Sequence, residues 1–196
     1  MHQIEPFYRW LKYYDSAVDP ASPFNGKEYN YDLYSETIYG YYIDPAWDYM
    51  GSETLYIKLL YVNYELGYAI IEMIGEWNDA LHNDIMHFKR NIIEALAFEG
   101  VNKYLLIGEN VMNFHGSDDS YYEEWFEEVE EISANQSSGW ISILGFQDHV
   151  LEEMKNFNID SYFNYGGGLQ INEWRTIHPL SLCKKIDEQI MKRLNA

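Results

Sequence analysis

The strongest constraint on this chain is a short apolar run that leads, after a polar interval, into a helix pattern with two faces. Residues 104–107 read Tyr-Leu-Leu-Ile, and from about 118 to 132 apolar residues recur on one side of a helix while glutamates fill the other. A buried strand followed by an amphipathic helix is the repeating unit of a parallel α/β sheet. In such sheets, ligands and modification sites gather where the strand gives way to the helix.

Further strand and helix patterns surround this unit. Strand patterns cover about 54–62, 68–75, 140–144 and 159–165, and helix patterns cover about 79–98 and 148–157. A short glycine-ended turn between the first two strands predicts an antiparallel hairpin. The run at 104–107 is bracketed by helices, which predicts a parallel, buried position. We therefore expect an α/β fold with a mixed sheet of four to five strands and helices mainly on one face.

The two ends of the chain read differently from this central part. Residues 1–52 contain four of the five prolines and many tyrosines, yet they are too apolar for disorder, so we interpret them as an aromatic arm packed on the domain. The arm is also a candidate surface for homo-oligomer formation. Residues 169–196 contain a helix that starts at Pro179 and buries Leu182, Cys183, Ile186, Ile190 and Leu194. With the α/β part at 53–168, we expect a single globular unit.

The charge of the chain limits the classes of partner that it can bind. The 32 acidic and 13 basic residues give a net charge of −19. Such a charge repels phosphate backbones and anionic membranes, so we expect neither nucleic-acid nor membrane binding. A protein partner with a basic surface suits this charge better.

Cysteine use and hydropathy indicate the compartment. Cys183 is the single cysteine, so no disulfide forms within the chain, as is usual in a reducing environment. The first residues lack the pattern of a signal peptide, and no stretch approaches the ~20 apolar residues that a membrane helix needs. We expect a cytoplasmic protein.

Three local patterns between about residues 53 and 165 resemble a known family. They are Met73-Ile74-Gly75-Glu76-Trp77-Asn78, then Lys103 to Ile107 with Val111 and Phe114, and finally Ile143-Leu144-Gly145-Phe146 with Asn158-Ile159-Asp160 and Phe163. Together they resemble the STAS superfamily, the fold of bacterial anti-sigma-factor antagonists and of the SpoIIAA-like proteins. The resemblance implies a STAS-like α/β domain and a non-enzymatic interaction or regulatory module that acts through a protein partner.

The resemblance also points to the start of the second helix. The family's Asp-Ser-Ser-Gly is replaced here by the segment from His115 to Ser120, in which Ser117 and Ser120 are the phosphorylation candidates. A phosphate at a helix N-terminus is stabilised by free N–H groups, whereas Asp118 and Asp119 would repel it. The alternative is that Ser117 and the aspartates cap the helix.

A ligand or metal site at the same junction is the alternative function. Glu109, His115, Asp118 and Asp119 are weak candidates for a Mg²⁺ or Mn²⁺ site, although their spacing matches no known metal motif. A small-ligand-binding protein or a metal-dependent enzyme would use this junction, covered by tyrosines of the arm. We assign no catalytic residue and no cofactor, and favour a non-enzymatic role.

The acidic face of the second helix is the candidate surface for a partner. Its members are Glu123, Glu124, Glu127, Glu128 and Glu131. They would dock on a basic surface, but a charge run on an amphipathic helix is as often only a solvated face.

Overall fold

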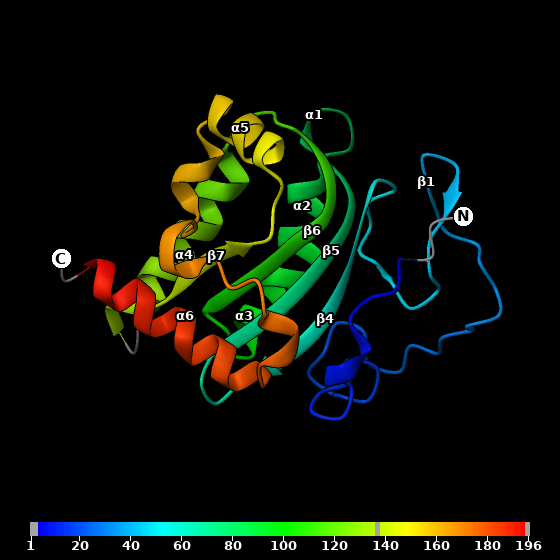
Figure 1. Ribbon diagram of the computed structural model, residues 1–196, viewed down its shortest axis with the longest axis horizontal. Helices are drawn as coiled ribbons and strands as arrows, with labels where there is room; N and C mark the ends of the chain where they lie inside the picture. Colours follow the sequence, from blue (N-terminus) through cyan, green and yellow to red (C-terminus); the bar gives the residue numbers. More distant parts are fainter. Residues whose placement is uncertain (1–3, 136–137, 195–196) are drawn as a thin grey trace.

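A five-stranded mixed sheet forms the centre of the protein (Figure 1). The computed structural model describes residues 4–135 and 138–194, and within them the side chains of all but 132–135 and 194. In sheet order the strands are β3 (Asp48–Tyr49), β4 (Leu55–Asn63), β5 (Tyr68–Asn78), β6 (Lys103–His115) and β7 (Trp140–Leu144). The pairs β3–β4 and β4–β5 are antiparallel, whereas β5–β6 and β6–β7 are parallel. The predicted α/β class, the hairpin and the mixed sheet are confirmed.

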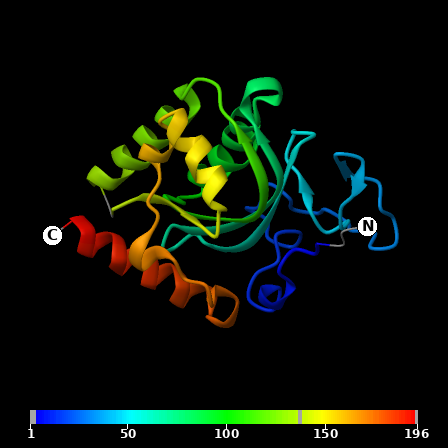
Figure 2. The ribbon, with the colours of Figure 1, turned by 45° about the horizontal axis from the view of Figure 1, so that its top comes forward.

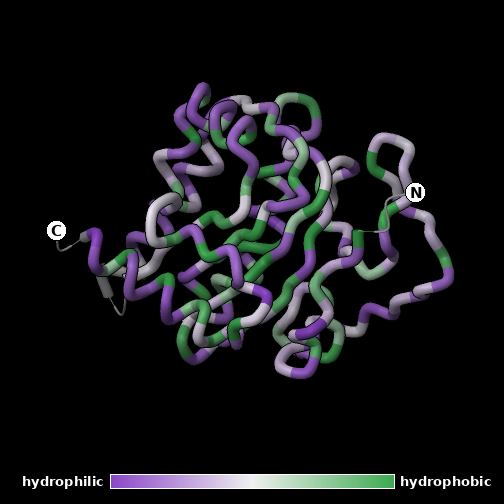
Figure 3. Tube along the Cα trace, viewed as in Figure 1, coloured by the Kyte–Doolittle hydropathy of each residue, from purple (hydrophilic) through white to green (hydrophobic). Residues whose placement is uncertain are grey.

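The helices that connect the parallel strands, together with the helix that follows β7, lie on one face of the sheet (Figure 1). These helices are α1 (Asp79–His82), α2 (Asp84–Phe88), the π-helix Lys89–Ile93, α3 (Glu94–Phe98), α4 (Ser120–Asn135) and α5 (Asp148–Asn156). Their apolar sides pack on alternate strand residues such as Ile71 and Leu106. Figure 3 shows many of the hydrophobic residues on the central strands.

The prediction of one continuous helix over 79–98 was wrong. The helix breaks at Asn83, which adopts a left-handed conformation with φ 52°. Asparagine tolerates this conformation better than most residues. The break lets the buried carboxylates of Asp79 and Asp84 turn inward, where Asp79 accepts hydrogen bonds from Trp77 and Tyr122.

The second face of the sheet is covered as well, so the expectation of helices mainly on one face was incomplete. Helix α6 (Pro179–Leu194) and the 3-10 helix Tyr8–Trp10 pack there against the other set of alternate strand residues (Figure 2). From these segments Leu182, Cys183, Ile186 and Trp10 are buried together with Ile70 and Leu105, and Trp174 of the 3-10 helix Trp174–Thr176 joins them. Burial raises the pKa of the Cys183 thiol to about 12, so this thiol stays protonated near neutral pH.

Two further boundaries differ from the prediction. Residues 159–165 do not form a strand: Ile159–Tyr162 is a 3-10 helix, and Asn164 makes a single bridge to Ser142 of β7. The polar interval after residue 107 does not end the strand, because β6 continues through it to His115 and pairs with β5 as far as Asn78. Pairing with β5 compensates the backbone of this polar stretch, which propensity alone does not reveal.

The N-terminal arm contributes a small hairpin and one strand of the main sheet. The hairpin consists of β1 (Thr37–Ile38) and β2 (Tyr41–Tyr42), and β3 lies at the edge of the main sheet. The carboxylate of Asp48 is fully buried between the ammonium groups of Lys27 and Lys58, at 2.7 and 3.1 Å. None of the helices in the described part of the chain combines the length and apolar character that crossing a bilayer requires.

Candidate functional site between the arm and the sheet

The junction before α4 is an exposed helix start. Ser117, Asp118 and Ser120 are exposed, and the Asp118 carboxylate accepts a hydrogen bond from the Ser120 amide at 3.2 Å. Hydrogen bonds from the hydroxyl and amide of Ser120 lower the pKa of Asp118. Asp119 accepts a hydrogen bond from the Tyr162 hydroxyl at 2.7 Å. The aspartates therefore order the helix start, and phosphorylation of Ser117 or Ser120 stays a prediction.

The four weak metal candidates are separated. Glu109 precedes His115 by six strand residues, roughly 20 Å along β6, and binds Trp174 and Arg175 instead. The His115 Nε2 lies 2.6 Å from a carboxylate oxygen of Glu76. Within the described residues, no three His, Cys, Asp or Glu side chains are grouped to hold a metal ion.

The acidic face of α4 divides into two rows. Glu124 and Glu128 bind the fully buried ammonium of Lys89 at 3.1 and 2.9 Å, and Glu124 also binds Arg90. The outer row consists of Glu123, Glu127 and Glu131, all exposed. The inner row of the predicted ridge is therefore compensated within the chain.

A different group of polar side chains lies on the second face of the sheet, opposite α4. Strand β5 alternates there, so that Glu72 and Glu76 point toward the arm while Met73 and Trp77 point toward the helices. Both glutamates are buried, at 1% and 6% exposure. Buried carboxylates require partners, and each of these finds its partner on another segment.

Glu72 joins three segments. Its carboxylate accepts the Phe7 amide of the arm at 2.8 Å, and the Arg175 guanidinium lies 3.9 Å away. Burial raises the pKa of Glu72 to about 7, although the Phe7 hydrogen bond and Arg175 both lower it. Arg175 also binds Glu109, and the Trp174 indole donates to Glu109 at 2.8 Å.

A bulge in β6 turns both Glu109 and its neighbour Asn110 toward the cavity between the arm and the sheet. Glu72 pairs with Ile107 and Ile74 pairs with Asn110, so β6 has one extra residue between these pairs. Such bulges redirect side chains. Gly108 allows this one, because a Cβ there would lie 2.3 Å from the Phe146 ring.

A cavity of about 450 Å³ opens beside this bulge, between the β1–β2 hairpin and the sheet. Its lining combines aliphatic side chains, three tyrosines and few polar groups, namely Ile4, Ile38, Tyr39, Tyr41, Tyr42, Ile43, Ile74, Glu109, Asn110, Met112 and Gln147. The volume falls within the ~300–1,000 Å³ typical of ligand pockets. The arm tyrosines thus cover the middle of β6, not the start of α4.

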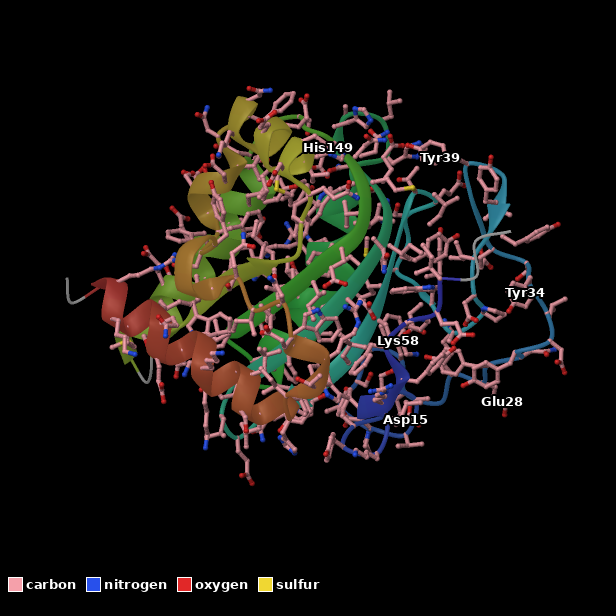
Figure 4. The ribbon with its side chains drawn as sticks, in the orientation of Figure 1. Asp15, Glu28, Tyr34, Tyr39, Lys58 and His149 are labelled. Carbon is pink, nitrogen blue, oxygen red and sulfur yellow. The ribbon has the colours of Figure 1, made fainter. Side chains whose placement is uncertain are left out.

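The tip of the hairpin is held against the sheet by Tyr39. Tyr39 and Gly40 are the two turn residues, both with positive φ (52° and 75°), as a type I′ turn requires. Tyrosine is unfavourable in this conformation. Partial burial and a hydrogen bond to Glu76 raise the pKa of the Tyr39 hydroxyl to about 12. Figure 4 labels Tyr39 between the hairpin and the sheet. Glu76 therefore links the hairpin tip to His115.

Several residues of this site were not singled out from the sequence. Glu72 lies within a mostly apolar strand pattern, and the sequence indicates Glu109 only as a metal candidate, not as part of a bulge. A charged residue within an apolar run and a glycine at position 108 are the two signals that could have indicated a buried carboxylate and a bulge. Arg175 and Tyr39 carry no such signal, because only the fold brings them to the sheet.

Comparison with protein-family models and with curated protein sequences finds no match to this chain.

Proposed function

We propose that this chain is a non-enzymatic binding protein whose ligand site is the cavity between the β1–β2 hairpin and the sheet. One observation carries the proposal: arm tyrosines and aliphatic sheet residues enclose about 450 Å³ beside the bulge that presents Glu109 and Asn110. An apolar cavity with a few convergent polar groups is the usual form of a small-molecule site.

The test uses Nile red, a neutral apolar dye whose fluorescence rises in apolar surroundings. We expect it to bind the full-length protein and to bind Met112→Trp at least tenfold more weakly, because Met112 lines the cavity and is 39% exposed. The matched control is Leu66→Trp, which enlarges a 43% exposed side chain in the β4–β5 turn. Dye binding that is absent, or that responds equally to both substitutions, contradicts the proposal.

A second candidate is the partner-binding module implied by the STAS resemblance. The order β4, β5, α1–α3, β6, α4, β7, α5 supports that resemblance. The exposed side chains of Glu123 and Glu127 support a basic partner, because α4 itself contains no basic residue.

Affinity capture from cell extract tests this candidate. We expect Glu123→Lys with Glu127→Lys to abolish capture of a partner that the unchanged chain retains. Glu152→Lys with Glu153→Lys reverses the same charge at exposed positions of α5 and should leave capture intact. Loss with both pairs would indicate only general charge attraction.

A further inference from the structure

The walls of the cavity carry charge of one sign. Among its described lining residues, Glu109 is the only charged side chain, and none is Lys, Arg or His. An anionic ligand would therefore meet no cationic side chain in the lining, and the neighbouring Arg175 guanidinium already binds Glu109. This arrangement disfavours phosphates and carboxylates.

Glu109 retains capacity for a further hydrogen bond. Trp174 donates to Oε1 and Arg175 to Oε2, whereas a carboxylate offers about four lone-pair sites. Its side chain is 29% exposed, unlike that of Glu72 at 2%. Asn110, placed next to it by the bulge, adds an amide oxygen.

Carboxylates outnumber cations behind this wall. Glu72 and Glu76 lie on β5 of the same face, so three carboxyl groups share this region with one guanidinium, that of Arg175, although burial keeps Glu72 partly protonated by raising its pKa to about 7. The net charge of −19 adds a long-range attraction for cations.

The opposite wall offers aromatic rings. Tyr39, Tyr41 and Tyr42 of the hairpin are 56%, 61% and 48% exposed. Tyrosine faces attract cations, and the chain already uses this contact where the Lys58 ammonium lies 4.0 Å from the Tyr29 ring centre.

Building on the proposed function, we infer that the ligand is an organic cation with an apolar body. Its ammonium group lies between the Glu109 carboxylate and the hairpin tyrosines, and its apolar part packs on Ile38, Ile74 and Met112. A bare metal ion would leave most of the 450 Å³ unfilled.

The test compares three probes of similar size: benzyltrimethylammonium, the anion benzenesulfonate and neutral benzyl alcohol. Binding to full-length protein is followed by the NMR shift of the Met112 methyl group at 150 mM salt, which screens the general field. We expect the cation to shift this signal and to bind at least tenfold more tightly than the anion.

Two variants of the cavity lining and one control locate the residues that favour the cation. Glu109→Gln keeps an acceptor for Trp174 and should weaken cation binding about tenfold. Glu123→Gln removes the same charge from exposed α4 and should change cation binding less than twofold. Tyr41→Leu, at a 61% exposed position, should weaken cation binding about two- to fivefold.

The outcomes separate the two proposals. If Nile red fails to bind the unchanged protein, the ligand site itself is wrong. If Nile red binds but the cation and the anion bind equally, or Glu109→Gln and Glu123→Gln weaken the cation equally, only the inference about ligand class is overturned. Should Glu109→Gln fail to fold, the probe comparison and Tyr41→Leu still decide.

Discussion

Lys89 carries a charge on a fully buried side chain. Its side chain is fully buried, and its ammonium binds Glu94, Glu124 and Glu128, each about 40% exposed. Burying an ammonium is unfavourable unless it is paired. Three partially solvated carboxylates supply that pairing and in turn depend on Lys89 to reduce their mutual repulsion.

We therefore expect Lys89→Met to lower the free energy of unfolding by about 2–3 kcal/mol, less than for a fully buried pair because the carboxylates keep some water. Urea denaturation followed by circular dichroism measures the loss. Lys155→Met, at an exposed position of α5, is the control and should change stability by less than ~0.5 kcal/mol. Equal stability of the two variants would contradict the role assigned to Lys89.

Glu72 makes the stability of the protein depend on pH. Burial raises its pKa from 4.5 to about 7, so the folded state holds this proton more tightly than the unfolded state does. Stability is then highest below the unfolded pKa and falls as the pH rises toward 7. Asp79, whose pKa burial also raises to about 7, acts in the same direction.

Glu72→Gln should remove part of this dependence while keeping an acceptor for the Phe7 amide. Between pH 5 and 7.5 we expect the free energy of unfolding to fall by about 2 kcal/mol more in the unchanged protein than in the variant. Urea denaturation at both pH values measures the difference. Glu123→Gln, on the exposed row of α4, corrects for the general effect of one lost charge. Parallel pH profiles for the unchanged protein and Glu72→Gln would show that Glu72 titrates normally.

At the scale of elements, the geometry of β5 depends on one glycine. Gly75 has φ +122°, and a Cβ there would lie 2.1 Å from the Thr54 carbonyl oxygen. The same carbonyl accepts the Glu76 amide at 2.9 Å. A side chain at 75 would therefore disrupt the strand that carries Glu72 and Glu76.

Gly75→Ala should lower the free energy of unfolding by more than about 2 kcal/mol, since both conformation and space oppose the methyl group. Gly166→Ala is a matched control, because Gly166 also has positive φ (+74°) but has open space where a Cβ would lie. We expect that variant to lose about 1 kcal/mol. Thermal melting measures the stability of both variants. A similar loss of stability in the two would mean that the contact with the Thr54 carbonyl relaxes without cost.

At the scale of the whole molecule, the arm is part of the core. Trp47 is 2% exposed and packs with Ile38, Ile43, Tyr56 and Ile74, so arm and sheet share one cluster. Its indole donates to the Ile4 carbonyl at 2.8 Å, which joins two parts of the arm. Other arm residues, including Tyr31 and Leu33, are exposed. Self-association through the arm therefore stays a proposal, which light scattering can test.

Trp47→Ala should lower the free energy of unfolding by about 3–5 kcal/mol, through lost burial and the cavity left behind. Leu33→Ala, at a 59% exposed position in the same arm, should have almost no effect. Hydrogen exchange should show the amides of 43–50 and of β5 opening with similar free energies in the unchanged protein. Much faster exchange in the arm would mean that it detaches independently.

The sequence by itself determined the α/β class, the hairpin, the parallel strands and the apolar sides of α4, α5 and α6. Hydrophobic periodicity records which side of an element is buried, and this information is local. The break at Asn83, the continuation of β6 to His115 and the absence of a strand at 159–165 followed instead from pairing and from buried partners.

Only the tertiary structure decided where the candidate site lies. Glu72, Glu109, Arg175 and Tyr39 come from four segments, and no spacing in the sequence relates them. The second face of the sheet is closed by α6 and the arm, so charged residues that would otherwise face water are buried and must find partners across the fold. That requirement, together with the extra residue between Ile107 and Asn110 of β6, placed Glu109 beside the hairpin tyrosines.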